Sequence, residues 1–489
     1  MNERVIKSFE EGAEQSGDIL TGGKKKHKLR IGLLTCGYFE YWRMYPTLRA
    51  KVEEDLKAVT DRITGSYPNV LLSGMVDTLD SAQQAGEMFR REQVDIILLV
   101  YGTYTADFIT LSALDQVKDK PLVIFSTQPH DDVDRNGDYE GSLRNSALIG
   151  IAQITGTLRK MKRDYKIVVG SVTDERAYGL IDRYLSAAQA VEDLREANIG
   201  IIGHVFRGMY DLELSKTFFK STFGVNVIMI QSCHLLEEWE KVTDKEVKEE
   251  TDALLARFRR KNVSVDDVER SMRLAVAMRK IAEKFHLDAM CFLDQHYVQK
   301  QVRTSARMGA SLLMERTGMS VNCEGDLAGL VMMMLMRSLT GNVPLMGEWG
   351  EYDKATNSCL VIGHGIGTPD MAADEKDVLL TRTPEEWGFD GAGLNYELIM
   401  KPGDATIGHI MEAPSGYRMI VSKVRSIDFP KLNFDELHAL AQTKTPINEY
   451  LEKVLDFGVS HHCIMTLGDC AEKLKAAAEL LGVQVFYIE

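Results

Sequence analysis

Several carboxylate and imidazole side chains stand at the ends of apolar segments in the second half of the chain, where their types could support metal chemistry. Glu324 begins a long apolar run, Glu348 lies beyond it, His364 ends another apolar run, and the pair His461-His462 begins a third. Carboxylate oxygens and imidazole nitrogens suit Mn²⁺, Co²⁺, Mg²⁺ or Fe²⁺, and the paired cysteines that favour structural zinc are missing from the set. The sequence therefore predicts a divalent-metal site with open positions for a bidentate substrate.

Each of these side chains also has a structural interpretation, which the sequence leaves open. Glu324 or Asp326 would cap the helix that follows them, where exposed backbone N–H groups favour an ionised carboxylate. Glu348 would be a loop carboxylate, and His364 a structural histidine after a strand. Adjacent side chains of an extended chain point to opposite faces, so we expect at most one histidine of the pair His461-His462 to face a given site.

The elements that must position these residues follow an alternation of strand and helix over the first two thirds of the chain. Short, continuous apolar runs separated by helical segments indicate a parallel sheet covered on both faces. The first group of runs predicts a Rossmann-like α/β domain over residues 28–168. Its strands are expected at 31–34, 70–76, 94–101 and 121–127.

A second group predicts a central α/β domain over residues 169–342, opened by a strand at 166–172. An amphipathic helix beginning at Ser264 has a capping-box start with Asp267 and leads into its last strand. Beyond residue 342, turns separate β-leaning stretches, as in an antiparallel sheet. The fold class is therefore α/β, with two Rossmann-like parallel-sheet domains followed by a mainly antiparallel β domain over 343–489 that ends in an αβ unit. Residues 1–27 are interpreted as a flexible tail.

Composition and charge exclude several classes of protein. The 489 residues carry a formal charge of −14, which argues against nucleic acid as a partner and suits an enzyme that acts on neutral small molecules. The longest apolar run is far shorter than the roughly 20 residues that cross a bilayer, so no membrane span is expected. Seven scattered cysteines without a CxxC pair fit a reducing compartment, and we expect a cytoplasmic location.

Two further segments have a possible ligand role. The glycines of 363–367 superficially match a dinucleotide loop but lack the full G-x-G-x-x-G pattern and a following helix, which argues against a nucleotide-dependent oxidoreductase. The aromatic segment from Cys36 to Trp42 follows the first strand, at the edge where parallel sheets bind ligands. It is equally consistent with packing at a domain or subunit interface.

Four short segments follow one another in the order Cys323-Glu324-Gly325-Asp326, Leu345-Met346-Gly347-Glu348, Ile362-Gly363-His364 and Ser460-His461-His462. Taken in this order, they resemble motifs of the L-arabinose isomerase family, and the related L-fucose isomerases share the Glu-Gly-Asp element. Ser126-Thr127-Gln128 resembles the family's His-Thr-Gln segment, and residues 203–207 take the place of a sugar-lining loop.

The resemblance implies an aldose–ketose isomerase of carbohydrate metabolism that works through a cis-enediol, with L-arabinose and L-ribulose as first choice for substrate and product. It implies a homo-oligomer, either a trimer or a hexamer, and Mn²⁺ or another divalent ion such as Co²⁺ or Mg²⁺ as cofactor. Glu324 and Glu348 would form the acid–base pair. The metal ligands it implies are Glu324, Glu348, His364 and His462, and the sugar-lining candidates are Tyr104, Gln128, Phe206 and Arg207.

The sequence departs from the family where the sugar is bound. Cys36-Gly37-Tyr38-Phe39-Glu40 replaces the family's Gly-Ser-Gln-His loop, and Ser126 replaces the histidine of His-Thr-Gln. The chemistry is therefore better supported than the substrate. L-fucose, D-arabinose or another aldose is an alternative substrate, and a non-catalytic sugar-binding protein of the same fold is the alternative from another class.

Overall fold

The computed structural model describes residues 28–133, 135–293, 295, 297–383, 393–433 and 435–489. They form two compact units, one ending at Glu192 and the other beginning at Asp193. The expected tail, 1–27, lies outside the described residues. The expected division into three domains, with boundaries near 168 and 342, stays a prediction.

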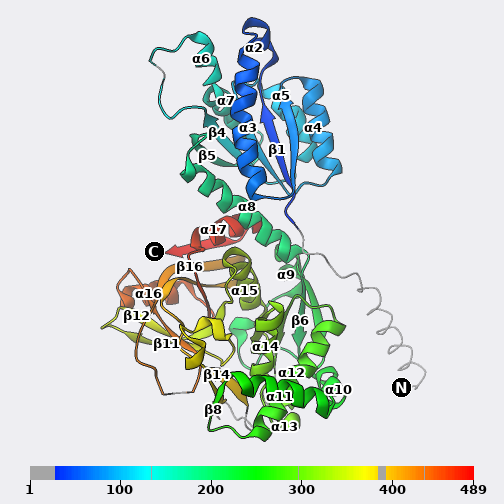
Figure 1. The fold of residues 1–489 in the computed structure, drawn as a ribbon, viewed down its shortest axis with the longest axis vertical. Coiled ribbons are helices and arrows are strands. Elements are labelled where there is room, and N and C mark those ends of the chain that lie inside the picture. The colour runs from blue at the N-terminus through cyan, green and yellow to red at the C-terminus, as the bar shows by residue number, and fades with distance from the viewer. Residues whose placement is uncertain (1–27, 134, 294, 296, 384–392, 434) are drawn as a thin grey trace, which may run out of the picture. The chain divides into compact units, whose positions relative to one another are not determined.

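The first unit is built on a five-stranded parallel sheet, drawn in blue to green in Figure 1, in the order β2-β1-β3-β4-β5. All residues of the central strands β1 and β3 are buried, which explains why they read as continuous apolar runs. The strands are β1 Ile31–Cys36, β2 Val70–Val76, β3 Ile96–Tyr101, β4 Leu122–Gln128 and β5 Lys166–Ser171.

Helices flank this sheet and supply the rest of its core (Figure 1). Thr78 caps α4 through a capping box with Ser81, because each side chain satisfies a backbone N–H of the other residue. The helices are α2 Phe39–Met44, α3 Leu48–Ser66, α4 Leu79–Arg91, α5 Asp107–Leu114, α6 Tyr139–Arg144, α7 Ala147–Lys160, the short η1 Asp115–Val117, and α8 Glu175–Arg195, which extends past the unit boundary.

One strand lies in a different sheet from the one expected. The sequence places the strand at 166–172 at the opening of the second group, but β5 pairs with β4 along its whole length and completes the first sheet. The pairing depends on contacts between segments far apart in the chain, and the periodicity of a single segment carries no information about its partner.

The second unit contains a four-stranded parallel sheet in the order β10-β9-β6-β7. As predicted, α12 begins with a capping box between Ser264 and Asp267. The strands are β6 Asn198–Ile202, β7 Asn226–Ile230, β9 Ala289–Phe292 and β10 Ser320–Cys323. The helices are η2 Tyr210–Leu212, α9 Lys216–Phe223, α10 Ser232–Glu240, α11 Asp244–Arg257, α12 Val265–Lys284, α13 Tyr297–Val302, α14 Arg307–Thr317 and α15 Leu327–Thr340.

The rest of the second unit is mainly antiparallel sheet. Its seven strands follow the order β15-β18-β11-β12-β17-β16-β19, and a further pairing of β15 with β16 closes all but β19 into a ring. Only β19 runs parallel to its neighbour. The strands are β11 Leu345–Asp353, β12 Ser358–Gly363, β15 Gly403–Ala413, β16 Gly416–Ile427, β17 His438–Gln442, β18 His462–Leu467 and β19 Gln484–Ile488.

Smaller elements complete this unit, and the predicted fold class is confirmed. The terminal αβ unit forms as expected, with Gly482 ending α17 in the left-handed conformation. A small sheet has the order β14-β13-β8. The remaining elements are β8 Arg259–Lys261, β13 Leu379–Arg382, β14 Leu394–Glu397, η3 Pro369–Met371, η4 Glu375–Asp377, α16 Ile447–Phe457 and α17 Ala471–Leu481.

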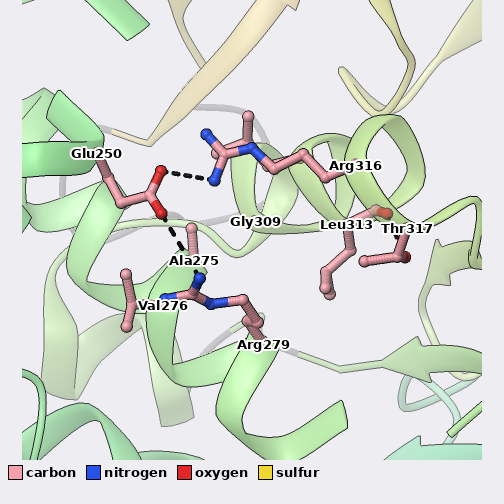
Figure 2. A pocket seen from close by; sticks show the side chains of 9 residues that line it. Glu250, Ala275, Val276, Arg279, Gly309, Leu313, Arg316 and Thr317 are labelled. Atoms are coloured by element: carbon pink, nitrogen blue, oxygen red, sulfur yellow. Dashed lines mark hydrogen bonds and ion pairs between the residues drawn. The ribbon is translucent and has the colours of Figure 1, made fainter. Parts of the chain in front are cut away.

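A small cavity between α11, α12 and α14 is lined by an ion-pair network. Arg316 donates to Glu250 at 2.6 Å, and Arg279 lies 3.9 Å from the same carboxylate (Figure 2). The cavity measures about 30 Å³, which has room for a water molecule or two but not for a sugar. Among the described residues, none of the helices combines the length and the apolar character that crossing a membrane requires.

Candidate metal centre

Glu324 reaches the candidate site through a sharp turn at the carboxyl edge of the second parallel sheet. Strand β10 ends at Cys323, and Glu324 and Gly325 follow in the left-handed conformation, with φ of 63° and 76°. Helix α15 begins directly after Asp326. Left-handed backbone costs a non-glycine residue of order 1–3 kcal/mol, and such strain is concentrated at functional sites. The turn therefore holds the Glu324 side chain at a fixed position beside a helix N-terminus.

The other candidate ligands come from three strands of the antiparallel sheet. Glu348 on β11 stands directly opposite His462 on β18, so the two side chains point to the same face. Strand β12 pairs with the other edge of β11, and His364 follows its last residue, Gly363. Neighbouring strand ends thus bring together residues separated by about a hundred positions in sequence.

The structure brings all four predicted ligand side chains together. His462 Nε2 lies 3.2 Å from Glu324 Oε2, and His364 Nε2 lies 3.5 Å from Glu348 Oε1. The ligand atoms of Glu348, His364 and His462 all lie within 4.8 Å of one another. Donors held at about 2.0–2.2 Å from one cation are separated by no more than about 4.5 Å, so these distances are close to what a shared ion requires.

Burial and missing hydrogen bonds also fit a cation at this point. His462 is fully buried, and Glu324 and His364 are nearly so. Among the residues that the structure describes, His364 Nε2 is buried without a hydrogen-bond partner. Buried polar atoms almost always have a partner, so an imidazole nitrogen that faces a carboxylate and lacks one fits metal ligation. The roles of these residues as ligands stay a prediction.

Asp326 holds His462 in place from the side away from Glu324. His462 Nδ1 donates to Asp326 Oδ2 at 3.0 Å, and His409 Nε2 donates to the same oxygen at 3.0 Å. The other oxygen of Asp326 accepts from Gly329 N at 2.7 Å, so this residue also caps α15, one of the two candidates for that role. A carboxylate behind a metal-binding imidazole fixes the ring orientation and raises its basicity.

Burial and neighbouring charges separate the pKa values of the two carboxylates. Burial raises the pKa of Glu324, but the imidazoles of His461 and His462 outweigh it and hold the pKa below its usual range. Burial also raises the pKa of Glu348, and there the net shift is upward. In the metal-free protein, Glu324 is therefore the ionised member of the pair, and Glu348 more readily holds a proton.

The pKa values of the two predicted histidine ligands, His364 and His462, are also shifted in opposite directions. Burial lowers the pKa of His364 to about 3, so its imidazole is neutral. Burial also lowers the pKa of His462, but hydrogen bonds to Asp326 and Glu324 outweigh it and raise the pKa to about 10. Metal binds the neutral imidazole, so His364 is ready to bind whereas His462 must first lose a proton.

His461 also faces the site, which corrects the expectation that the members of the histidine pair point to opposite faces. The rings of His461 and His462 are 4.1 Å apart, and His461 Nε2 lies 3.8 Å from Glu324 Oε2. Alternation of side chains holds within a strand, but β18 begins only at His462. His461 lies in the bend before the strand, so the alternation does not apply to it.

The four predicted sugar-lining residues divide between the two units. Phe206, in the loop after β6, donates its backbone N–H to Glu324 O at 3.1 Å, and Arg207 beside it is exposed. Tyr104 and Gln128 belong to the first unit. The Tyr104 ring packs edge-on against Tyr38 at 5.5 Å, and Gln128 Nε2 donates to His130 O at 2.6 Å. Their contact with a sugar stays a prediction.

Sequence reasoning missed several residues around the centre. Gln295 donates to Glu324 Oε1 at 2.9 Å, and Asp211 accepts from His461 Nδ1 at 2.6 Å. Neither stands out in the sequence, because both are polar residues in loop segments. His409 had a usable signal: it is a lone imidazole in the apolar strand β15, where a buried polar group needs a partner.

Comparison with known proteins adds to this geometry. No family model matches the chain. It is 20% identical to a sulfoquinovose isomerase from Priestia aryabhattai over 84% of this chain and 89% of the relative. It is 22% identical to an L-arabinose isomerase from Aeromonas hydrophila over 86% of each chain. A sulfoquinovose isomerase from Alkalicoccus urumqiensis is 21% identical over 76% of this chain and 81% of the relative.

The chain is similar to sugar isomerases over most of its length. This confirms the expected resemblance to the L-arabinose isomerase family and indicates an enzyme of the aldose–ketose isomerase class. The isomerases that it resembles are named for two different sugars, and the identities to them are nearly equal. The similarity therefore indicates a small sugar as substrate without distinguishing between the two.

Proposed function

We propose that the protein is a metal-dependent aldose–ketose isomerase that converts L-arabinose to L-ribulose in arabinose catabolism. The observation that carries the proposal is the meeting of two carboxylates and two imidazoles: Glu324 contacts His462, Glu348 contacts His364, and the ligand atoms of Glu348, His364 and His462 lie within 4.8 Å of one another. They meet in a chain that is similar to sugar isomerases. We further propose that the enzyme is a homo-oligomer, a trimer or a hexamer.

Glu324, Glu348, His364 and His462 would hold the cation, with Mn²⁺ as first choice and Co²⁺ or Mg²⁺ as alternatives. Two oxygen and two nitrogen donors suit ions of this class. When bound, a divalent cation supplies Lewis-acid stabilisation of negative charge that develops on the oxygens of the sugar. With these four donors, the ion would keep room for two adjacent sugar oxygens.

The two carboxylates would move the protons. Conversion of an aldose to a ketose transfers one proton from C2 to C1 and another from the oxygen on C2 to the oxygen on C1, through a cis-enediol. In the metal-free protein the pKa of Glu324 lies below its usual range and that of Glu348 above it, so the surroundings of the two carboxylates favour different protonation states, as an acid–base pair requires. The pair thus provides the base and the acid that the reaction needs.

Sulfoquinovose is a second candidate substrate, favoured by the similarity to sulfoquinovose isomerases. A sulfonated sugar carries an anion, and the planar guanidinium of arginine recognises such groups with paired hydrogen bonds. Arg207 is a candidate for this contact because it is exposed and follows Phe206, whose backbone bonds Glu324 O. An Arg207→Ala variant would then lose activity on sulfoquinovose more than on L-arabinose.

The test is ketose formation by metal-stripped protein, with and without added Mn²⁺, Co²⁺ or Mg²⁺. The panel contains L-arabinose, sulfoquinovose, L-fucose and D-arabinose. We expect metal-dependent conversion of at least one aldose, with chelation abolishing it. No ketose from any sugar with any of the three ions would contradict the proposal and favour a non-catalytic sugar-binding protein.

A further inference from the structure

The loop that follows β6 is attached to the candidate metal centre at two points. Near its start, the backbone N–H of Phe206 donates to Glu324 O at 3.1 Å. Near its end, in η2, Asp211 Oδ2 accepts from His461 Nδ1 at 2.6 Å. The first contact joins the loop to the turn that carries Glu324, and the second joins it to the turn before β18.

Asp211 organises the whole turn in front of β18. In addition to the His461 ring, its Oδ2 accepts from the backbone N–H of His461 at 3.1 Å and from Ser460 Oγ at 3.1 Å. Ser460 Oγ in turn accepts from His462 N at 3.2 Å. One carboxylate oxygen therefore fixes both the backbone before β18 and the orientation of the His461 imidazole.

The two neighbouring histidines, His461 and His462, are each paired with a carboxylate. In each pair, Nδ1 contacts an aspartate, Asp326 for His462 and Asp211 for His461. In each pair, Nε2 points to Glu324 Oε2, at 3.2 Å for His462 and 3.8 Å for His461. An imidazole held in this way by a carboxylate is oriented for a contact at its other nitrogen.

The pairs differ in their access to solvent, which separates their roles. The His462 side chain is fully buried, whereas that of His461 is 34% exposed. Among the described residues, His461 Nε2 has no hydrogen-bond partner. A fifth protein ligand would take up room at the ion that a bidentate sugar needs. His461 Nε2 is itself buried, lies 3.8 Å from Glu324 Oε2 and has its ring oriented by Asp211, so it is placed to contact a sugar oxygen beside Glu324.

We propose that His461 contacts the substrate, with Nε2 hydrogen-bonded to a sugar oxygen, and that Asp211 is the positioning residue that aims this imidazole. The proposal rests on the proposed function, because it requires a sugar at the centre. It makes the loop after β6 part of the substrate site through Asp211, a residue that does not touch the sugar. It also explains why a half-exposed aspartate accepts three hydrogen bonds at one oxygen.

The test compares metal binding with sugar binding in His461→Gln and Asp211→Ala. We expect both variants to bind Mn²⁺ within about threefold of wild type in an electron paramagnetic resonance titration, since neither residue is a ligand. Binding of L-arabitol, or of the alditol of the aldose that the panel identifies, to Mn²⁺-loaded protein should weaken about tenfold, the loss expected for one hydrogen bond. KM should rise by a similar factor.

Two further variants separate positioning from general disruption of the loop. Asp211→Asn keeps an oxygen that can accept from His461 Nδ1, so we expect it to retain most of the alditol affinity. Glu213→Ala is the matched control, because it removes an exposed carboxylate two residues away, and it should behave as wild type. Should His461→Gln fail to fold, Asp211→Ala carries the test, because the Asp211 side chain is 38% exposed and its loss leaves little cavity.

Three results would overturn the proposal. Loss of Mn²⁺ binding in His461→Gln, to the extent seen in His462→Gln, would make His461 a ligand. Unchanged alditol affinity and KM in His461→Gln would exclude a substrate contact. Equal losses in Asp211→Asn and Asp211→Ala would exclude positioning by hydrogen-bond acceptance. Failure of the proposed function is recognised separately, because wild-type protein would then bind no Mn²⁺ or form no ketose, and the assignment of His461 would fall with it.

Discussion

At the scale of single residues, Glu324 and Glu348 reach the centre by different routes, and the difference sets what each can do. Glu324 is nearly buried on a strained turn, with Gln295 and His462 as neighbours of its carboxylate. Glu348 stands on a strand and keeps 29% of its side chain exposed. In the metal-free protein Glu324 is thus held ionised among imidazoles, whereas Glu348 is more accessible to solvent and its pKa is raised.

Replacement of either carboxylate should therefore abolish turnover without unfolding the protein. We expect Glu324→Gln and Glu348→Gln to lower kcat by about 10²–10⁴-fold, the range typical of a lost acid or base. Glu351→Gln is the matched control, since Glu351 is exposed on the same strand β11. Activity would be measured as ketose formed, alongside circular dichroism. Near-native kcat in either site variant would remove that residue from the proton transfers.

The protonation of His462 should make metal binding depend on pH. The Asp326 and Glu324 carboxylates raise the pKa of His462 from 6.5 to about 10. Its contribution to the stability of the metal-free protein is therefore fully present below pH 6.5 and is lost as the pH rises through about 10. Mn²⁺ has to displace this proton, whereas His364 is already neutral.

We accordingly expect about one proton to be released from the histidines per Mn²⁺ bound near neutral pH. The affinity for Mn²⁺ should rise by about tenfold per pH unit between pH 6.5 and 8.5. The measurement is a Mn²⁺ titration in weakly buffered protein with a pH indicator. A dissociation constant that stays constant over this range would show that His462 is neutral in the free protein.

The residues of the centre could be predicted from the sequence only in part. Glu324, Glu348, His364 and His462 stand where apolar segments end, and that placement together with the family resemblance selected them. Asp211 lies 250 positions from His461, and nothing in the local pattern connects the two. Gln295 likewise has a role only because the fold brings it to Glu324. A local sequence pattern cannot predict contacts that form only because the fold brings distant residues together.

At the scale of elements, the start of α15 links the stability of the fold to the metal centre, because the residue that caps the helix also holds residues of the centre. Asp326 caps the helix at Gly329 N and at the same time holds His462 and His409. The sequence predicted a cap at this position but gave no indication of the two imidazoles.

The positions of the strands in the first unit were also predictable from apolar runs. The partner of β5 was not predictable, because pairing is a property of two segments rather than one.

Removal of this cap should affect stability and metal binding together. We expect Asp326→Ala to lower the melting temperature of the metal-free protein, because a lost cap costs about 1 kcal/mol and leaves His409 unpaired in the interior. Affinity for Mn²⁺ should fall about 10- to 100-fold, as is usual when the group behind a metal ligand is removed.

Asp326→Asn separates the two effects. Asparagine caps a helix as well as aspartate does, so most of the capping contribution should return while the charge that holds His462 is still missing. We expect its melting temperature to lie between those of Asp326→Ala and wild type, with Mn²⁺ affinity still reduced. Wild-type Mn²⁺ affinity in Asp326→Ala would show that Asp326 serves the helix alone.

At the scale of the whole molecule, all four predicted ligands lie in the compact unit that begins at Asp193, and two of the predicted sugar-lining residues lie in the other. The alternation of apolar strands with helices was enough to predict the two parallel-sheet regions, and the turns between β-leaning stretches beyond residue 342 predicted the change to antiparallel sheet. Closure of the antiparallel strands into a ring was not predictable, because it depends on the pairing of β15 with β16 in addition to the linear order.

The most direct test of the account is the position of Mn²⁺ in crystals of the protein, located by its anomalous scattering. We expect one strong peak within about 2.0–2.3 Å of Glu324, Glu348, His364 and His462. His461 Nε2 should stay outside that distance. A peak bound elsewhere, or bound by fewer than three of these four side chains, would contradict the account.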